Sequence, residues 1–158
     1  MDFTRTSPYR VLPHVARRRT VRADRLLGRC GMAFNGFSAD ERAWLASQKL
    51  GRLATVSPDG ILGNAPVTYF VRADDTIDIG GMRMGATKKF RNVEAGSRVA
   101  FVVDIVDTSE GWHPIYLEIR GTAEALADAG PPADGFSPEV IRIHPDWVKS
   151  FNLPTAST

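Results

Sequence analysis

The chain has little cysteine and no long apolar stretch. Cys30 is the single cysteine among 158 residues, so no disulfide can form within the chain. No uninterrupted apolar run approaches the ~20 residues that cross a membrane as a helix. The sequence also has no metal-binding spacing of cysteine, histidine or acidic residues and no serine in a nucleophile elbow. These absences argue against disulfide-rich, membrane, metal and serine-hydrolase proteins, and they favour a cytoplasmic setting.

Lysine is scarce as well, and the basic charge is unevenly spread. Residues 1–31 hold eight arginines and two aspartates, a net charge of +6, whereas residues 32–158 carry 12 basic and 16 acidic side chains, a net charge of −4. The larger part is therefore mildly acidic, and no helix-turn-helix pattern or aromatic platform accompanies the arginines. We expect neither nucleic acid nor a membrane as a partner.

The distribution of apolar residues predicts one folded domain. Residues 1–35 show no regular apolar period and are expected to form a disordered, arginine-rich extension, with a basic interaction arm as the alternative. Residues 36–153 are expected to fold as the domain, and residues 154–158 to form a frayed tail.

The folded part is expected to start with a helix and to continue in strands. Ser38-Ala39-Asp40-Glu41 is a capping box that predicts a helix to about Gln48, with Trp44 and Leu45 buried. Gly121 marks a bend or bulge in a long strand, and residues 145–150 are expected to form a turn or short helix. The six predicted strands are 52–56, 62–71, 76–80, 98–104, 115–126 and 140–144.

Six strands with one helix between the third and fourth predict a mainly β protein, a small closed antiparallel barrel. A doubly wound α/β fold would need a helix after nearly every strand.

The inserted helix carries its charges in the unfavourable order. Lys88, Lys89 and Arg91 lie near its start and Glu94 near its end, before Gly96 as the C-terminal cap. The helix dipole favours the reverse order by roughly 0.3–1 kcal/mol for each charge. An anion bound by the long cations, the Thr87 hydroxyl and free backbone N–H groups would remove this penalty. We therefore predict a phosphate site here, with a solvated basic face as the alternative.

Seven short pieces, taken together and in order, resemble one protein family. They are 50–60, 64–67, 79–81, 88–93, 98–104, 118–124 and 141–145. With these pieces the chain resembles the pyridoxamine 5'-phosphate oxidase-like, FMN-binding split β-barrel family, and in particular its F420-dependent actinobacterial branch.

The resemblance implies a Greek-key split β-barrel that forms a homodimer, with a cofactor at the subunit interface. It implies an oxidoreductase that uses the deazaflavin F420 to transfer a hydride to or from an electron-poor small molecule. An FMN-dependent oxidase or reductase and a non-catalytic cofactor-binding protein are the alternatives.

The same resemblance assigns two groups of cofactor-binding residues. The cofactor phosphate is expected at Thr87, Lys88, Lys89 and Arg91, and Arg83 either reaches the cofactor or decorates a turn. The ring is expected against Arg52, Ala54, Thr55, Asn64, Pro66 and Val67, in part through backbone groups. Several relatives carry arginine followed by lysine where this chain has Lys88-Lys89. A lysine in place of that arginine cannot bind the phosphate through two N–H groups at once.

No catalytic residue is assigned. His113 and His144 are candidates for a general acid, but each lies beside a proline at a strand end or loop, and we interpret them as structural. Trp112, Trp147 and Phe151 could line a groove or could serve the core or a subunit contact.

Overall fold

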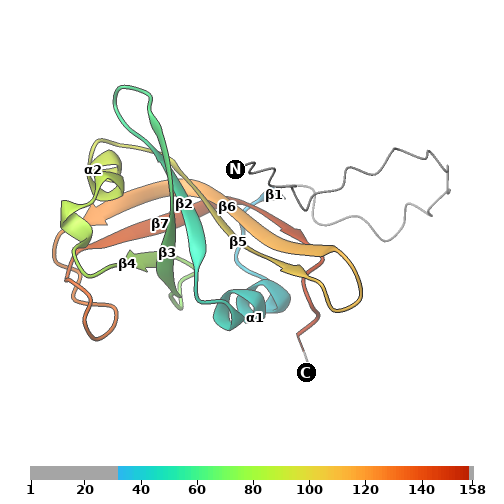
Figure 1. Ribbon diagram of the computed structural model, residues 1–158. Coiled ribbons are helices and arrows are strands. Elements are labelled where there is room, and N and C mark those ends of the chain that lie inside the picture. Colours follow the sequence, from blue (N-terminus) through green and yellow to red (C-terminus); the bar gives the residue numbers. More distant parts are fainter. Residues whose placement is uncertain (1–31, 157–158) are drawn as a thin grey trace, which may run out of the picture.

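Six strands close into a barrel because β7 pairs along both of its edges. In the computed structural model, which describes residues 32–156, β7 (Val140–Phe151) lies between β4 (Ile77–Gly80) and β6 (His113–Leu126). The barrel order is β7-β4-β3-β2-β5-β6, and all pairs are antiparallel. Figure 1 shows this closure. The mainly β class and the six-stranded antiparallel barrel are confirmed.

The connections give the Greek key that was expected. The strands β2 (Gly51–Val56), β3 (Leu62–Val71) and β4 form a meander. The next strand, β5 (Val99–Asp107), returns to pair with β2, so the fourth strand lies beside the first. The helix α2 (Lys88–Glu94) is inserted between β4 and β5 as predicted, after a short 3-10 turn, η2 (Met84–Ala86).

The barrel interior is filled by alternate side chains of every strand. Leu53, Ile79, Phe101, Ile119 and Ile143 come from five different strands, and each is at most 1% exposed. A strand places successive side chains on opposite faces, so this alternation leaves the intervening residues on the outside of the barrel. Burial of each such side chain is worth about 1.5–3 kcal/mol.

The first helix, α1 (Ala39–Ser47), begins at the predicted capping box. Ser38 N donates to Glu41 Oε2 at 2.8 Å, and Glu41 N donates to Ser38 Oγ at 3.3 Å. Trp44 and Leu45 are buried against the barrel, as predicted. The Tyr69 hydroxyl donates to the Leu45 carbonyl at 2.7 Å, and burial raises the pKa of Tyr69, which keeps this hydroxyl a donor.

One prediction about the last strand is wrong. Residues 145–150 were predicted as a turn or short helix, yet β7 continues through them to Phe151. Pro145 lies opposite Gly121, where the register of β6 and β7 shifts, so its missing N–H is accommodated at a bulge. The bulge expected at Gly121 is confirmed.

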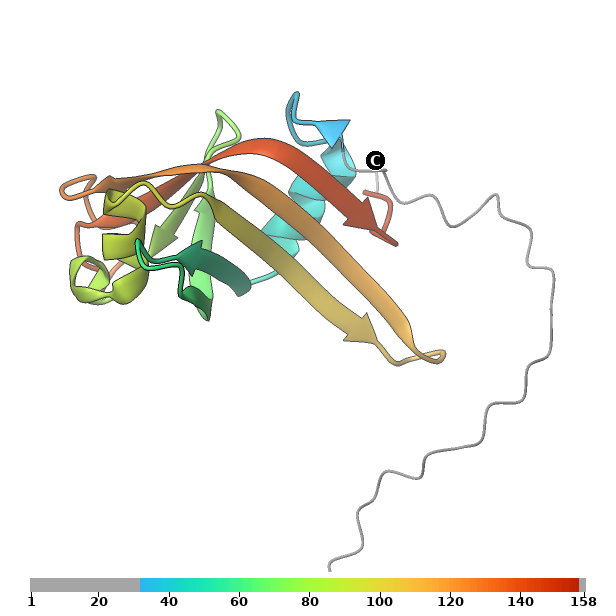
Figure 2. The ribbon, with the colours of Figure 1, turned by 90° about the horizontal axis from the view of Figure 1, so that it is seen from above.

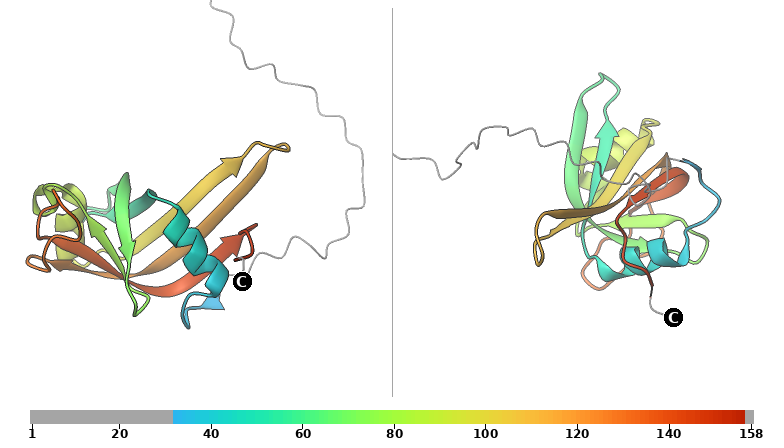
Figure 3. Two further views of the ribbon diagram at one scale, coloured as in Figure 1. Left: turned by 90° about the horizontal axis from the view of Figure 1, so that it is seen from below. Right: turned by 90° about the vertical axis from the view of Figure 1, so that its right-hand side faces the viewer.

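The hairpin of β5 and β6 is longer than predicted. β5 runs to Asp107 and β6 starts at His113, and Figures 2 and 3 show this hairpin projecting well past the rest of the barrel. Its outer part carries Ile105, Val106 and Trp112, which are 39%, 39% and 76% exposed.

The sheet also extends before the predicted domain start. A short strand, β1 (Met32–Ala33), pairs with β7, so these two residues belong to the sheet and not to the expected extension. Residues 1–31 of that extension lie outside the described residues. At the other end, Ala156 N donates to Asp40 Oδ1 at 2.7 Å, which holds this part of the expected frayed tail against α1. None of the helices within residues 32–156 has the length and hydropathy to span a bilayer.

We predict that Gly121→Ala destabilises the fold, because an added Cβ would lie 2.1 Å from the His144 carbonyl oxygen. The obstacle is backbone, so either β7 shifts or the bulge opens, and we expect a loss of about 1–3 kcal/mol or more. Chemical denaturation measures the change. Gly63→Ala is the matched strand control, since its added Cβ meets nothing nearer than 3.7 Å, and equal effects of the two variants would contradict the prediction.

Candidate functional site

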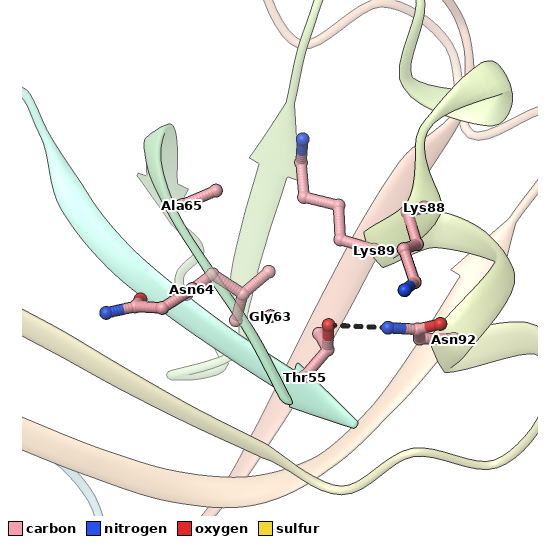
Figure 4. Close-up of a pocket in the computed structure, with 8 residues that line it drawn as sticks. Thr55, Gly63, Asn64, Ala65, Lys88, Lys89 and Asn92 are labelled. Carbon is pink, nitrogen blue, oxygen red and sulfur yellow. Dashed lines mark hydrogen bonds between the residues drawn. The ribbon is translucent and has the colours of Figure 1, made fainter. Parts of the chain in front are cut away.

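A pocket of about 180 Å³ opens between α2 and the ends of β2 and β3. Figure 4 shows two lysine side chains leaving α2 on the side that faces the strands, across from Thr55, Gly63 and Ala65. The full lining is Leu53, Thr55, Gly63, Asn64, Ala65, Lys88, Lys89 and Asn92. The pocket therefore has apolar and backbone walls on the strand side and all of its charge on the helix side.

The two lysines differ in how their charge is compensated. Lys88 is exposed, and its charge contributes to lowering the pKa of Asp59, after the larger effect of a hydrogen bond from Ser57. Lys89 is half-buried, and this burial lowers its pKa below the usual 10.5. Within residues 32–156 no carboxylate forms an ion pair with Lys89. Lys89 is thus a partly desolvated cation that lacks a protein counter-charge in this part of the chain.

Asn92 joins the helix to the strand floor. Its side chain is 3% exposed, and Asn92 Nδ2 donates to Thr55 Oγ1 at 2.9 Å. Sequence reasoning missed Asn92. The available signal was its spacing, three and four residues after Lys89 and Lys88, which places all three side chains on one helix face.

Four of the residues expected at the cofactor line this pocket: Thr55, Asn64, Lys88 and Lys89. The contribution of Asn64 is through its backbone side, because its amide points away from the lysines in Figure 4. Val67 is 4% exposed and belongs to the core, so only its backbone remains available.

Three other expected residues lie on the opposite face of the sheet. Ala54 pairs with Asn64 and Arg52 pairs with Pro66, so these side chains share the outer surface of the barrel. Arg52 forms an ion pair with Asp104 there. The strand alternation therefore divides the predicted ring-binding residues between two faces.

The remaining expected residues are occupied by local structure. Thr87 Oγ1 donates to the Met84 carbonyl at 2.7 Å and accepts from Phe90 N at 3.3 Å, so it caps α2. Arg91 Nη1 donates to the Ala86 carbonyl at 2.9 Å on the exposed side of the helix, and Arg83 is exposed in the preceding turn. In this short helix, the lysine side chains are the groups that remain to meet an anion.

The pocket is suited to binding an anion more than to acid–base chemistry. Lys88 and Lys89 are its only titratable lining residues. The two histidines considered from the sequence lie elsewhere: His113 Nε2 is 3.2 Å from the Glu110 carbonyl, and His144 is 3.4 Å from Glu124. Both contacts fit the structural interpretation.

Comparison with known proteins agrees with the fold and adds a family. Residues 37–156 match the family described as pyridoxamine 5'-phosphate oxidase. A 5a,11a-dehydrotetracycline/5a,11a-dehydrooxytetracycline reductase from Streptomyces rimosus is 41% identical over 119 residues, which are 74% of this chain and 84% of that protein.

Two solved structures share the fold at low identity. A conserved hypothetical protein from Mycobacterium tuberculosis is 23% identical with a TM-score of 0.57, over 78% of this chain and 92% of that one. An FAD binding protein from Mycobacterium smegmatis is 21% identical with a TM-score of 0.53, over 72% and 93% of the two chains. The long family match and the 41% identical relative together establish that this chain belongs to the pyridoxamine 5'-phosphate oxidase family of oxidoreductases.

Proposed function

We propose that the protein is an F420-dependent reductase that holds the phosphate of its cofactor against Lys88 and Lys89 and reduces an electron-poor small molecule. The observation that carries the proposal is Lys89, a half-buried ammonium with a lowered pKa and no ion pair within the described residues. Burying a cation without a partner costs free energy, and a bound phosphate would offset that cost.

The lining residues fit a phosphate-bearing cofactor. The two ammonium groups provide charge-assisted donors, and the Thr55 and Asn92 side chains are already bonded to each other and so shape the pocket wall. The strand side offers Gly63 and Ala65, which leave room for a ligand to approach the backbone. This is a site for an anionic tail with a larger flat group beyond it.

A reduced deazaflavin bound at this site supplies a hydride equivalent, which is chemistry that protein side chains lack. The residues of the chain bind and orient. Lys88 and Lys89 neutralise the phosphate, and Asn92 fixes the helix that carries them against β2. Because the titratable residues that line the pocket, Lys88 and Lys89, are assigned to the phosphate, we expect water to supply the proton that completes the reduction.

The Streptomyces relative supports reduction as the direction of the reaction. Its name describes a reductase of 5a,11a-dehydrotetracyclines, compounds with a double bond to be reduced. We propose the same reaction class for this chain, in a cytoplasmic homodimer. The exposed apolar side chains Ile105, Val106 and Trp112 on the β5–β6 hairpin support a subunit contact.

Binding titrations of the purified protein with F420 and with FMN test the function. We expect saturable binding of F420 that is at least about tenfold tighter than that of FMN, and oxidation of reduced F420 by an enone substrate panel. Tighter FMN binding would favour the flavin-dependent alternative, and tight F420 binding without turnover would favour a non-catalytic binding protein. Binding of neither cofactor would refute the proposal.

Lys89→Met should separate binding from stability. Removing the ammonium while keeping an apolar stem should weaken F420 binding by about 10- to 150-fold, which corresponds to about 1.5–3 kcal/mol for a charge-assisted phosphate contact. The same variant should unfold at an equal or higher temperature, because it removes a desolvated charge. Lys149→Met, a lysine outside the pocket, is the control. Loss of affinity with a parallel loss of stability would indicate a structural role instead.

The affinity should also depend on pH through Lys89. Burial lowers its pKa below 10.5, so the ammonium is lost as the pH rises through that lowered value. F420 affinity should therefore fall at alkaline pH before an ordinary lysine would titrate. In Lys89→Arg the charge persists and the fall should disappear. Identical profiles of the wild type and this variant, measured by titration from pH 7 to 10, would count against Lys89.

Asn92→Asp should damage the site through charge alone. The carboxylate can accept a hydrogen bond from the Thr55 hydroxyl, so the link to β2 is kept while a negative charge enters the pocket. We expect F420 affinity to fall at least about tenfold. Thr55→Val, which removes the hydrogen bond without adding charge, should have the smaller effect. Circular dichroism checks that both variants fold, and unaltered affinity of the aspartate variant would exclude Asn92 from the site.

A further inference from the structure

We infer that a second hollow, on the outer face of the barrel, binds the substrate, and that this substrate is a largely apolar small molecule with one anionic group such as a carboxylate or enolate. The hollow has a volume of about 290 Å³. It is lined by Ala54, Thr55, Val56, Leu62, Arg98, Val99, Ala100 and Arg120.

The hollow arises from small residues in one row across the sheet. The strand register aligns Asn64 with Ala54, Ala54 with Ala100, Ala100 with Arg120, and Arg120 with Trp147. The two alanines at the centre leave a depression between larger neighbours. Val56 and Leu62 form its apolar side, and Leu62 is 79% exposed, which is unusual for a side chain of this size. A flat apolar molecule could lie on the two alanines and pack its edge against Val56 and Leu62.

The charge of the lining selects the kind of ligand. Arg98 and Arg120 are its only charged residues, and no carboxylate lines the hollow. Each arginine has an acidic partner outside the lining: Arg98 pairs with Asp146, and Arg120 Nη2 is 2.7 Å from Glu118 Oε1. A ligand inside the hollow therefore meets guanidinium groups, whereas the carboxylates lie beyond them. This arrangement favours an anion over a cation.

Both arginines retain the capacity to bind. Their side chains are 63% and 55% exposed, and exposed ion pairs of this kind contribute only about 0–1 kcal/mol, so the acidic partners can be shared or displaced at little cost. Each guanidinium has five N–H donors, more than one carboxylate can use. The Arg120 guanidinium also lies 4.2 Å from the centre of the Trp147 ring, which restricts its orientation.

The hollow adjoins the lysine pocket. Thr55 lines both, so the two cavities lie on either side of the same strand end. The assignment of this ligand as substrate depends on the proposed reductase function, but the binding of an apolar anion to the hollow does not.

Calorimetric titration of the cofactor-free full-length protein with 2-naphthoate and with its neutral analogue 2-naphthalenemethanol tests the inference. We expect naphthoate to bind at least about fivefold more tightly than the alcohol. Arg98→Gln and Arg120→Gln should each weaken naphthoate by about three- to tenfold, as for a partly exposed charged contact, without changing the alcohol. Ala100→Leu, which fills the floor, should weaken both probes. Arg42→Gln, an ion-paired arginine on α1, is the matched control.

Three results would overturn the inference. Equal binding of the two probes, or naphthoate affinity that is unaltered in both glutamine variants, would remove the anion preference. A dimer that Ala100→Leu converts to monomers in sedimentation velocity would assign the hollow to a contact between two copies. Lys89→Met keeps the two proposals apart: the variant should lose F420 affinity and retain naphthoate binding if both hold. Unaltered F420 affinity would count against the lysine pocket, and loss of naphthoate binding would count against the hollow as a separate site.

Discussion

The pairing of β7 with both β4 and β6 is the constraint on which the other features depend. It closes the barrel, so that β2 and β3 must curve over the core and their hairpin end must stand beside α2. β6 and β7 change register at Gly121, where the His144 carbonyl occupies the space that a side chain would need. A bulge of this kind bends the two strands without breaking the ladder.

Within the pocket, the lysine proposed to bind the ligand also lowers the stability of the fold. A half-buried lysine without an acidic neighbour weakens the folded state, because burial disfavours its charged form. The same burial lowers the pKa of Lys89. Several arginines in the described part of the chain are paired closely: Arg142 holds buried Asp78 with contacts of 2.7 and 2.9 Å, and Arg72 adds a third. What sets Lys89 apart is that it is half-buried as well as unpaired in the described part of the chain, and this is the basis of the proposed anion site.

The sequence predicted the fold better than the site, for a physical reason. Strand and helix patterns depend on local alternation, caps and turns, and these were strong at Ser38, Gly96 and Gly121. The prediction of a turn or short helix at residues 145–150 was wrong, because the register shift between β6 and β7 that accommodates Pro145 depends on the partner strand and is not encoded locally. Whether a residue belongs to the site depends on which face of the sheet or helix its side chain lies on, and on whether its polar atoms already form hydrogen bonds within the protein. The side chains of Thr87 and Arg91 satisfy nearby carbonyl groups, and neither commitment is visible in a list of residue types.

Strand alternation also explains how one short segment can serve two ligands. Along β2, Leu53 and Thr55 face the lysine pocket, whereas Ala54 and Val56 face the outer hollow. A cofactor tail on one side and an apolar anion on the other would then be separated by the thickness of a single strand end, near the exposed tip of the β2–β3 hairpin. Transfer of a hydride requires the reacting groups to be held in close contact. The cofactor ring would therefore have to reach the outer face, where Ala54, one of the residues expected at the ring, lines the hollow. Fixing β2 in the barrel fixes both surfaces at once.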